Sequence, residues 1–137
     1  MTIDDLVDNF EFLDNWEDRY RLLIDMGREL PEFPDDERTE DNRVEGCTSN
    51  VWLIHGVEPG SPSRLTFRAD SDAFIVKGLI AIILAAYSGR TPEEIRNTDI
   101  AGLFSRLGLE QHLTPSRRNG FFAMVERIHE IAASEAA

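Results

Sequence analysis

The residue best suited to chemistry is Cys47, which stands in the segment RVEGCTSNVWL over positions 43–53 and is the only cysteine in the chain. One thiol forms no internal disulfide and supplies no cysteine-rich metal cage. What remains is a small buried hydrophobe or a nucleophile presented on a loop. Gly46 permits a tight backbone, and Thr48 and Ser49 bring hydroxyl groups able to hydrogen-bond a thiolate or a bound sulfur. The local residues alone leave both interpretations open.

The three histidines do not form a recognisable site with this cysteine. A Cys–His hydrolase needs an imidazole beside the thiol and a third group that orients the imidazole. His55 lies eight residues along an expected strand from Cys47, His112 precedes an expected helix cap, and His129 falls in the last expected helix. One cysteine and three histidines at these spacings match no zinc pattern. We therefore expect no bound metal and keep a hydrolase only as a remote alternative.

Two cationic positions are unusual. Lys77, the only lysine, lies in an apolar helical segment, but no glycine-rich phosphate cradle accompanies it. We therefore expect it to extend to the helix margin or to pair with an acid rather than to hold pyridoxal phosphate. Arg117 and Arg118 fall in the first turn of the last expected helix, where positive charge is unfavourable. Either they grip the carboxylates of a partner or they form internal salt bridges.

The formal net charge of −12 is concentrated in the first third of the chain. Residues 1–46 contain 16 acids and 5 bases, whereas residues 47–137 contain 10 acids and 9 bases. Nucleic acid is a poor partner for such a chain, because phosphate contacts need clustered lysine and arginine. The acidic face either steers a basic protein partner toward Cys47 or simply keeps the protein in solution.

Length and composition indicate a single domain over 1–137. A chain of 137 residues with 42% hydrophobic and 29% charged residues can bury a core without disulfide staples. The N-terminus carries neither the basic nor the apolar region of a secretory signal, and the longest apolar stretch, around 78–86, is too short to cross a bilayer. We expect a cytoplasmic protein with no membrane partner.

Periodicity predicts helices, then a hairpin, then helices. Helical spacing and capping residues predict helices over 3–13, 16–30 (capped by Asn15), 72–88 (capped by 70–72), 100–107, and after Thr91-Pro92 and Thr114-Pro115. The β-rich runs 51–57 and 64–69 flank a Pro- and Gly-rich turn and predict an antiparallel hairpin, with Val44 able to start a further short strand. Residues 31–43 read as an irregular acidic loop. This order favours an α+β fold, with a small antiparallel β-sheet packed against helices.

Many of these segments, in this order, are similar to those of the SufE family, the sulfur acceptors of the SUF iron–sulfur cluster assembly system, and of the related CsdE proteins. The matching segments are 15–20 (NWEDRY), 30–31 (LP), 44–52 (VEGCTSNVW), 70–73 (DSDA), 75–79 (IVKGL), 107–117 (including QHLTPSR over 111–117) and Gly120. The likeness spans nearly the whole chain. Thr48 and Asn50 depart from it, because the family often has Gln at both positions.

The resemblance implies a function for Cys47. SufE proteins take sulfur from a partner cysteine desulfurase, which holds it as a persulfide, and they pass it to an iron–sulfur scaffold. The partner would be SufS-like or CsdA-like and the scaffold SufBCD-like. The pyridoxal phosphate belongs to the desulfurase, so this chain would need no cofactor of its own. The implied fold resembles the IscU scaffold, with Cys47 on a loop supported by Gly46, Thr48 and Ser49.

Other parts of this interpretation stay open at the level of sequence. A regulator that binds a desulfurase without accepting sulfur would carry the same motifs, and whether the chain forms a homodimer is undetermined. We expect Asp70, Asp72 and Arg117 to contribute to a docking surface for the partner. We also expect apolar neighbours to shield the sulfur of Cys47, because an exposed persulfide would be lost to small thiols.

Overall fold

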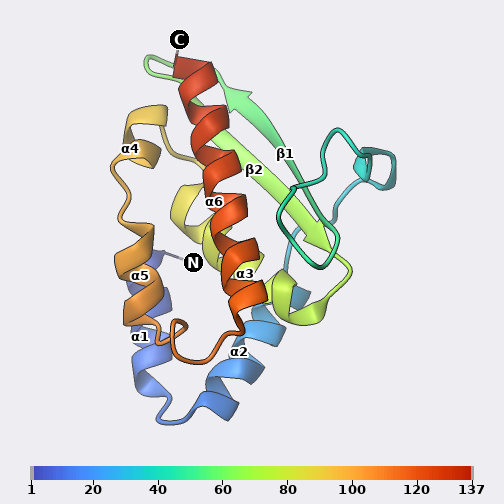
Figure 1. The fold of residues 1–137 in the computed structure, drawn as a ribbon. Coiled ribbons are helices and arrows are strands. Elements are labelled where there is room, and N and C mark those ends of the chain that lie inside the picture. The colour runs from blue at the N-terminus through green and yellow to red at the C-terminus, as the bar shows by residue number, and fades with distance from the viewer. Residues whose placement is uncertain (1, 137) are drawn as a thin grey trace.

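The computed structural model describes residues 2–136 and has an α+β architecture, as the sequence predicts. The described chain forms six α-helices, one 3₁₀ turn and one two-stranded sheet (Figure 1). In order, the elements are α1 (Ile3–Phe12), α2 (Trp16–Arg28), η1 (Asp35–Glu37), β1 (Val51–Glu58), β2 (Arg64–Ser71), α3 (Phe74–Tyr87), α4 (Pro92–Arg96), α5 (Ile100–Arg106) and α6 (Pro115–Ala136). None of the helices within residues 2–136 combines the length and apolar character that crossing a membrane requires.

Most helices begin at the predicted capping residues. Thr2 and Thr91 each form a reciprocal capping box with the acid three residues later, and the side chains of Asn15 and Asp99 accept a hydrogen bond from the first turns of α2 and α5. These bonds satisfy backbone N–H groups that a helix start leaves without partners. The local sequence is therefore sufficient to fix where these four helices start.

The predicted hairpin is confirmed, and its second strand is longer than predicted. Strands β1 and β2 pair antiparallel from Val51 opposite Ser71 to Glu58 opposite Arg64, so β2 continues two residues past Ala69. Val44 does not start a strand. It donates its N–H to the carbonyl of Val51 at 2.8 Å, within a single β-bridge beside β1.

Helix α3 begins later than predicted, at Phe74 rather than at residue 72. Its N-cap is Ala73, whose N–H donates to the Ser71 hydroxyl, and no side chain caps the helix itself. Asp72 is engaged elsewhere, with Asn50. Phe74 begins the helix but does not join the core. Its side chain is 66% exposed, because in the first turn it is Ile75 and Val76 that face the core.

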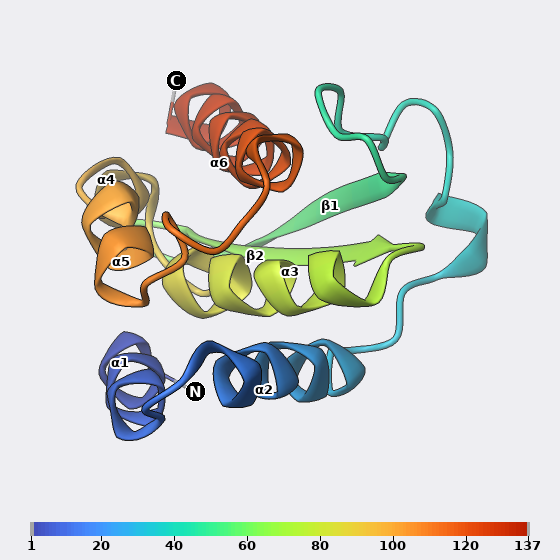
Figure 2. The same cartoon turned by 60° about the horizontal axis from the view of Figure 1, so that its bottom comes forward.

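The remainder of α3 is the centre of the fold. Figure 2 shows α2 along one side of α3 and the hairpin on the other, and α6 also packs against α3. Two glycines let α2 and α3 approach closely. A Cβ atom built on Gly78 would lie 2.3 Å from the carbonyl oxygen of Leu23, and one built on Gly27 would lie 2.8 Å from the Gly78 nitrogen. At these two glycines the backbones of α2 and α3 meet directly, whereas side chains normally keep packed helices apart.

The close approach of α2 and α3 predicts whether a substitution at Gly78 stabilises or destabilises the protein. Helix propensity alone would make Gly78→Ala stabilising by about 1 kcal/mol. Because the methyl group would meet the backbone of α2, we expect a net destabilisation of about 1–3 kcal/mol in urea unfolding instead. The control is the reverse exchange on the same helix, Ala81→Gly, with an expected cost of about 1 kcal/mol. A stabilised Gly78→Ala protein would contradict the close packing of α2 and α3.

Candidate functional site

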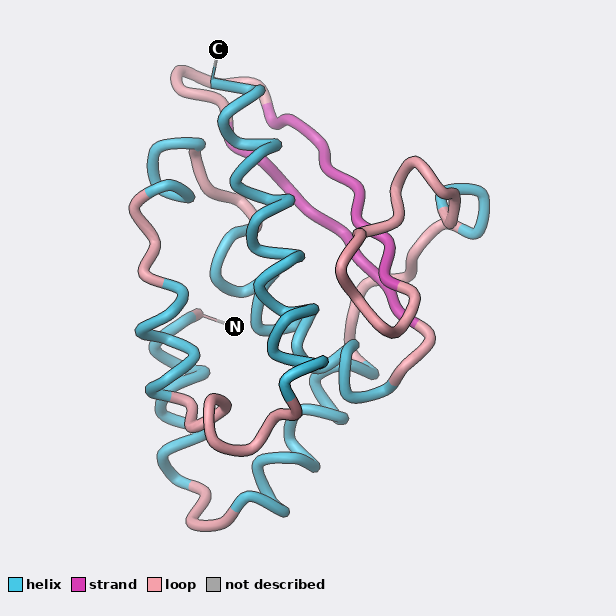
Figure 3. Tube along the Cα trace, in the orientation of Figure 1, coloured by secondary structure: helices cyan, strands magenta, loops and turns pink. Residues whose placement is uncertain are grey.

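Cys47 lies on the loop that enters β1, and this loop is held at both ends. Figure 3 shows the connection from α2 to β1 as mostly loop with one short helical turn. Before Cys47, Val44 is bound to β1 by its backbone; after it, Asn50 donates its N–H and its side-chain amide to the Asp72 carboxylate at 3.2 and 3.0 Å. Gly46 has φ of 90°, a conformation that favours glycine. The thiol is therefore presented on a short span between two fixed points.

The thiol is half-buried against α6. Its S–H donates a hydrogen bond to the carbonyl of Gly120, with the sulfur and oxygen 3.6 Å apart. A small cavity of about 20 Å³ lies beside it. The apolar residues lining the cavity are Val51, Val76, Leu79, Phe121 and Met124. The cavity has room for about one water-sized atom, and its lining agrees with the expectation that apolar neighbours shield the sulfur.

Two opposing effects act on the protonation of this thiol. Burial raises the pKa of Cys47, because the thiolate is poorly solvated in its pocket. The positive charge of Arg43 opposes this and lowers the pKa by a smaller amount. The Nε atom of Arg43 is buried and has no hydrogen-bond partner among the described residues. The resting thiol is protonated at neutral pH, and Arg43 is the group that favours its ionisation.

The predicted supporting residues surround the thiol in different ways. The Thr48 hydroxyl bonds to the Ser116 hydroxyl at the start of α6, and Ser49 lines the cavity. Arg117 lines the same cavity and is exposed. The structure thus brings Thr48, Ser49 and Arg117 to Cys47. It adds Gly120 and Ser116, which sequence reasoning did not assign to the thiol's surroundings because they lie 73 and 68 residues from their partners.

The carboxylates of Asp70 and Asp72 have partners within the protein. Asp70 accepts hydrogen bonds from Arg38 and lies 3.4 Å from the ammonium of Lys77, and Asp72 holds Asn50. The expectation that Lys77 pairs with an acid is confirmed. The guanidinium of Arg117, by contrast, forms no ion pair with another residue of the described chain.

The three histidines contact residues other than Cys47. His55 lies 3.2 Å from Glu135, His112 stacks on Trp16 with ring centroids 4.5 Å apart, and His129 hydrogen-bonds the hydroxyl of Tyr87. No imidazole within residues 2–136 hydrogen-bonds Sγ of Cys47. A Cys–His hydrolase has no base here. In the same part of the chain, no three His, Cys, Asp or Glu side chains gather where they could hold a metal ion.

Fold and site together define a class: a small α+β protein that presents a single half-buried thiol on a loop. The comparison with known families identifies it further. The family described as "SufE: Fe-S metabolism associated domain" matches residues 4–132. The chain belongs to the SufE family, and this membership supports a role in sulfur transfer with a cysteine desulfurase in iron–sulfur metabolism.

Individual relatives agree with this assignment. The chain is 46% identical over 128 residues to an "uncharacterized SufE-like protein" of Rhizobium meliloti strain 1021, covering 93% of this chain and 91% of the relative. It is 46% identical over 138 residues to a second SufE-like protein, from Rhizobium etli, with coverage of 99% and 93%. The solution structure of a hypothetical protein from Thermus thermophilus has the same fold, with a TM-score of 0.78, 22% identity and coverage of 99% and 98%.

The charge of Arg43 predicts a change in thiol reactivity. Only the thiolate reacts with iodoacetamide, so the midpoint of the rate-against-pH curve reports the pKa of Cys47. We expect Arg43→Gln to move this midpoint to higher pH and to slow alkylation at pH 7, because the charge that stabilises the thiolate is removed. Arg28→Gln, in an exposed pair on α2, is the control. An unmoved or lowered midpoint would show that Arg43 does not act on the thiol.

Proposed function

We propose that this protein accepts a sulfur atom from the persulfide of a cysteine desulfurase onto Cys47, stimulates that enzyme by draining it, and delivers the sulfur to an iron–sulfur scaffold. One observation carries the proposal most directly. The only thiol of the chain lies at an apolar cavity with room for about one more atom, on a loop held by a few polar contacts. Membership of the SufE family supplies the kind of partner.

The transfer is an exchange between sulfur atoms. The Cys47 thiolate attacks the outer sulfur of the partner's persulfide, so that a new S–S bond forms at Cys47 and the partner's own S–S bond breaks. The electron pair of the broken bond leaves with the partner's cysteine as a thiolate. No external oxidant or reductant is needed, because the outer sulfur moves at constant oxidation state. Delivery to the scaffold repeats the exchange with Cys47 as the donor.

The cavity suits the state in which Cys47 carries a persulfide better than the state in which the Cys47 thiolate attacks the partner. In the closed loop the added sulfur would lie among apolar side chains such as Val76 and Phe121, away from small thiols that would reduce it. Attack on the partner requires the sulfur to leave this shelter. We therefore propose that the Cys47 loop swings outward when the partner binds, and that the low reactivity of the closed thiol prevents exchange with other molecules.

The remaining roles follow from this proposal. The pyridoxal phosphate resides in the desulfurase, which is SufS-like or CsdA-like, and the receiving scaffold is SufBCD-like. The protein itself contributes a nucleophile and no cofactor. We place it in the cytoplasm, where reducing conditions keep a single cysteine available for exchange.

The proposal predicts where sulfur accumulates. After incubation with a desulfurase and free cysteine, we expect mass spectrometry to find one added sulfur atom on the peptide that contains Cys47. Cys47→Ser should bind the desulfurase but carry no sulfur and fail to deliver it to the scaffold. An unmodified Cys47 beside a loaded desulfurase would contradict the acceptor role.

The same experiment separates the alternative functions. A regulator that stimulates the desulfurase without accepting sulfur would retain its stimulation in Cys47→Ser, whereas an acceptor loses it. A thiol-dependent hydrolase would form an acyl adduct instead of a persulfide on Cys47, although no imidazole hydrogen-bonds the thiol within residues 2–136.

A further prediction concerns docking. Arg117 is exposed at the rim of the Cys47 cavity and free of internal ion pairs in the described chain, so it is placed to meet a carboxylate of the desulfurase. We expect Arg117→Ala to weaken desulfurase binding by about five- to tenfold, with a steeper loss at low salt. Calorimetry against Arg28→Ala provides the comparison. Equal affinities for the two variants would remove Arg117 from the docking surface.

A further inference from the structure

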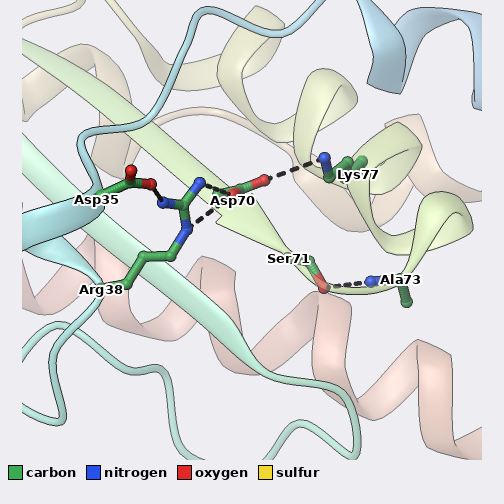
Figure 4. Close-up of polar contacts among 6 residues, drawn as sticks. All are labelled: Asp35, Arg38, Asp70, Ser71, Ala73 and Lys77. Atoms are coloured by element: carbon green, nitrogen blue, oxygen red, sulfur yellow. Dashed lines mark hydrogen bonds and ion pairs between the residues drawn. The ribbon is translucent and has the colours of Figure 1, made fainter.

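Arg38 ties the acidic loop before Cys47 to the C-terminal end of β2, where Asp70 lies. Its Nε and Nη2 atoms donate to one oxygen of Asp70 at 3.1 and 2.7 Å, while Lys77 approaches the other oxygen at 3.4 Å (Figure 4). Asp35 adds a further contact to the same guanidinium. Asp70 thus lies between two cations that come from different parts of the fold.

This cluster is shielded more than an ordinary surface ion pair. The Asp70 side chain is 13% exposed and that of Arg38 31%. Burial alone would raise the pKa of Asp70, but hydrogen bonds from Arg38 and the Ser71 backbone, with the charge of Lys77, outweigh it and hold the pKa below its usual value. The carboxylate is therefore ionised, and removing a cation would leave it partly buried with fewer partners.

The guanidinium is also fixed by aromatic rings. It lies 5.5 Å from the centroid of Phe33 and 6.0 Å from that of Trp52. Trp52 belongs to β1 and is bridged to Arg43, four residues before the thiol. The same side chain thus contacts the loop, the first strand and, through Asp70, the second strand.

A continuous series of contacts leads from Arg38 to Cys47. Backbone hydrogen bonds fold residues 35–43 into successive turns, and the Asn42 side chain donates to the carbonyl and carboxylate of Glu37. The Asn42 carbonyl then accepts from Leu53 of β1 at 2.9 Å, and Val44 donates to Val51. The segment 35–44 therefore behaves as one strap, fixed by Arg38 at one end and by β1 at the other, with Cys47 three residues beyond.

We propose that Arg38 is a positioning residue, and that its contact with Asp70 holds the strap on the sheet and thereby keeps the Cys47 loop closed over its cavity. Breaking the contact leaves the strap held on β1 only by the backbone bonds of Asn42 and Val44, which then open more readily, while the Asn50–Asp72 contact holds the other end of the loop. The loop then opens more often without unfolding of the core. The role of Arg38 in keeping the loop closed does not depend on the proposed function. Only its consequence does, which is that Arg38 governs how well a persulfide on Cys47 is sheltered.

The test measures Cys47 in the isolated protein, with no desulfurase present. Arg38→Met keeps an apolar stem of similar length and removes the charge. We expect its alkylation by iodoacetamide to be about tenfold faster than in the wild type, from the loss of a charge-assisted hydrogen-bonded contact. Arg28→Met, which removes an arginine from an exposed pair on α2, is the matched control and should react at the wild-type rate.

The urea dependence of the same reaction distinguishes loop opening from lost global stability. A local opening exposes little surface, so the added reactivity should be nearly independent of low urea concentrations. Reactivity that rises with the full slope of global unfolding would mean that Arg38 only stabilises the fold, and would overturn the proposal. An unchanged rate in Arg38→Met would overturn it as well.

A double-mutant cycle tests the partner that we assign to Arg38. Asp70→Asn should also accelerate alkylation, and the double variant should react no faster than the faster single one, because both changes break the same contact. The fluorescence of Trp52, measured with Trp16→Phe as background, should change in Arg38→Met. Independent, multiplying effects of the two substitutions, or an unchanged Trp52 signal, would contradict the assignment.

A last experiment relates the Arg38–Asp70 contact to sulfur transfer. When wild-type Cys47 and Arg38→Met are both loaded by a desulfurase, the variant should lose its sulfur to glutathione faster. Equal loss from the two loaded proteins would overturn the sheltering role. If the wild type fails to load at all, the proposed function fails, while the alkylation results still decide whether Arg38 holds the loop closed.

Discussion

The constraint on which this structure depends is that α3 has to be covered on nearly all sides. Its buried residues recur around the whole helix, so no single neighbour can remove them from water. Helix α2 covers one side through the glycine contact, and the hairpin and α6 cover others. Where β1 and α6 meet over the N-terminal half of α3, they leave the small cavity that Cys47 lines. The site is thus a small gap between the elements that pack around one helix.

The packing around α3 shelters the thiol and also raises its pKa, which lowers the fraction present as the reactive thiolate. Val76 and Leu79 of α3 and Phe121 and Met124 of α6 exclude water from one side of the sulfur, which favours its neutral form. In the proposed function, Cys47 needs this shelter once it holds a sulfur atom, and it needs to be a thiolate when it attacks the partner. Arg43 supplies a positive charge that favours the thiolate and so opposes the effect of burial.

Local signals predict the elements of the fold but not the contacts that assemble the site. Thr2, Asn15, Thr91 and Asp99 start their helices as capping chemistry predicts, because the partner lies only three residues away. The motif around Cys47 marks the thiol as a candidate but leaves a buried hydrophobe and a nucleophile both open, and it is the family resemblance that favours the nucleophile. The pairing of Arg38 with Asp70 spans 32 residues, and periodicity holds no information at that range. Asp72 shows the same limit. The sequence predicts that Asp72 caps a helix, but in the structure its carboxylate accepts hydrogen bonds from Asn50 instead.

The way the loop is fastened bears on how it can move. The S–H···O hydrogen bond from Cys47 to Gly120 is long, at 3.6 Å, and the contacts of Thr48 with Ser116 and of Asn50 with Asp72 join polar side chains at the surface. Water can replace each of these when they break, so opening costs far less than exposing α3 would. For the proposed sulfur carrier, such an opening would change the exposure of one atom while the fold stays intact.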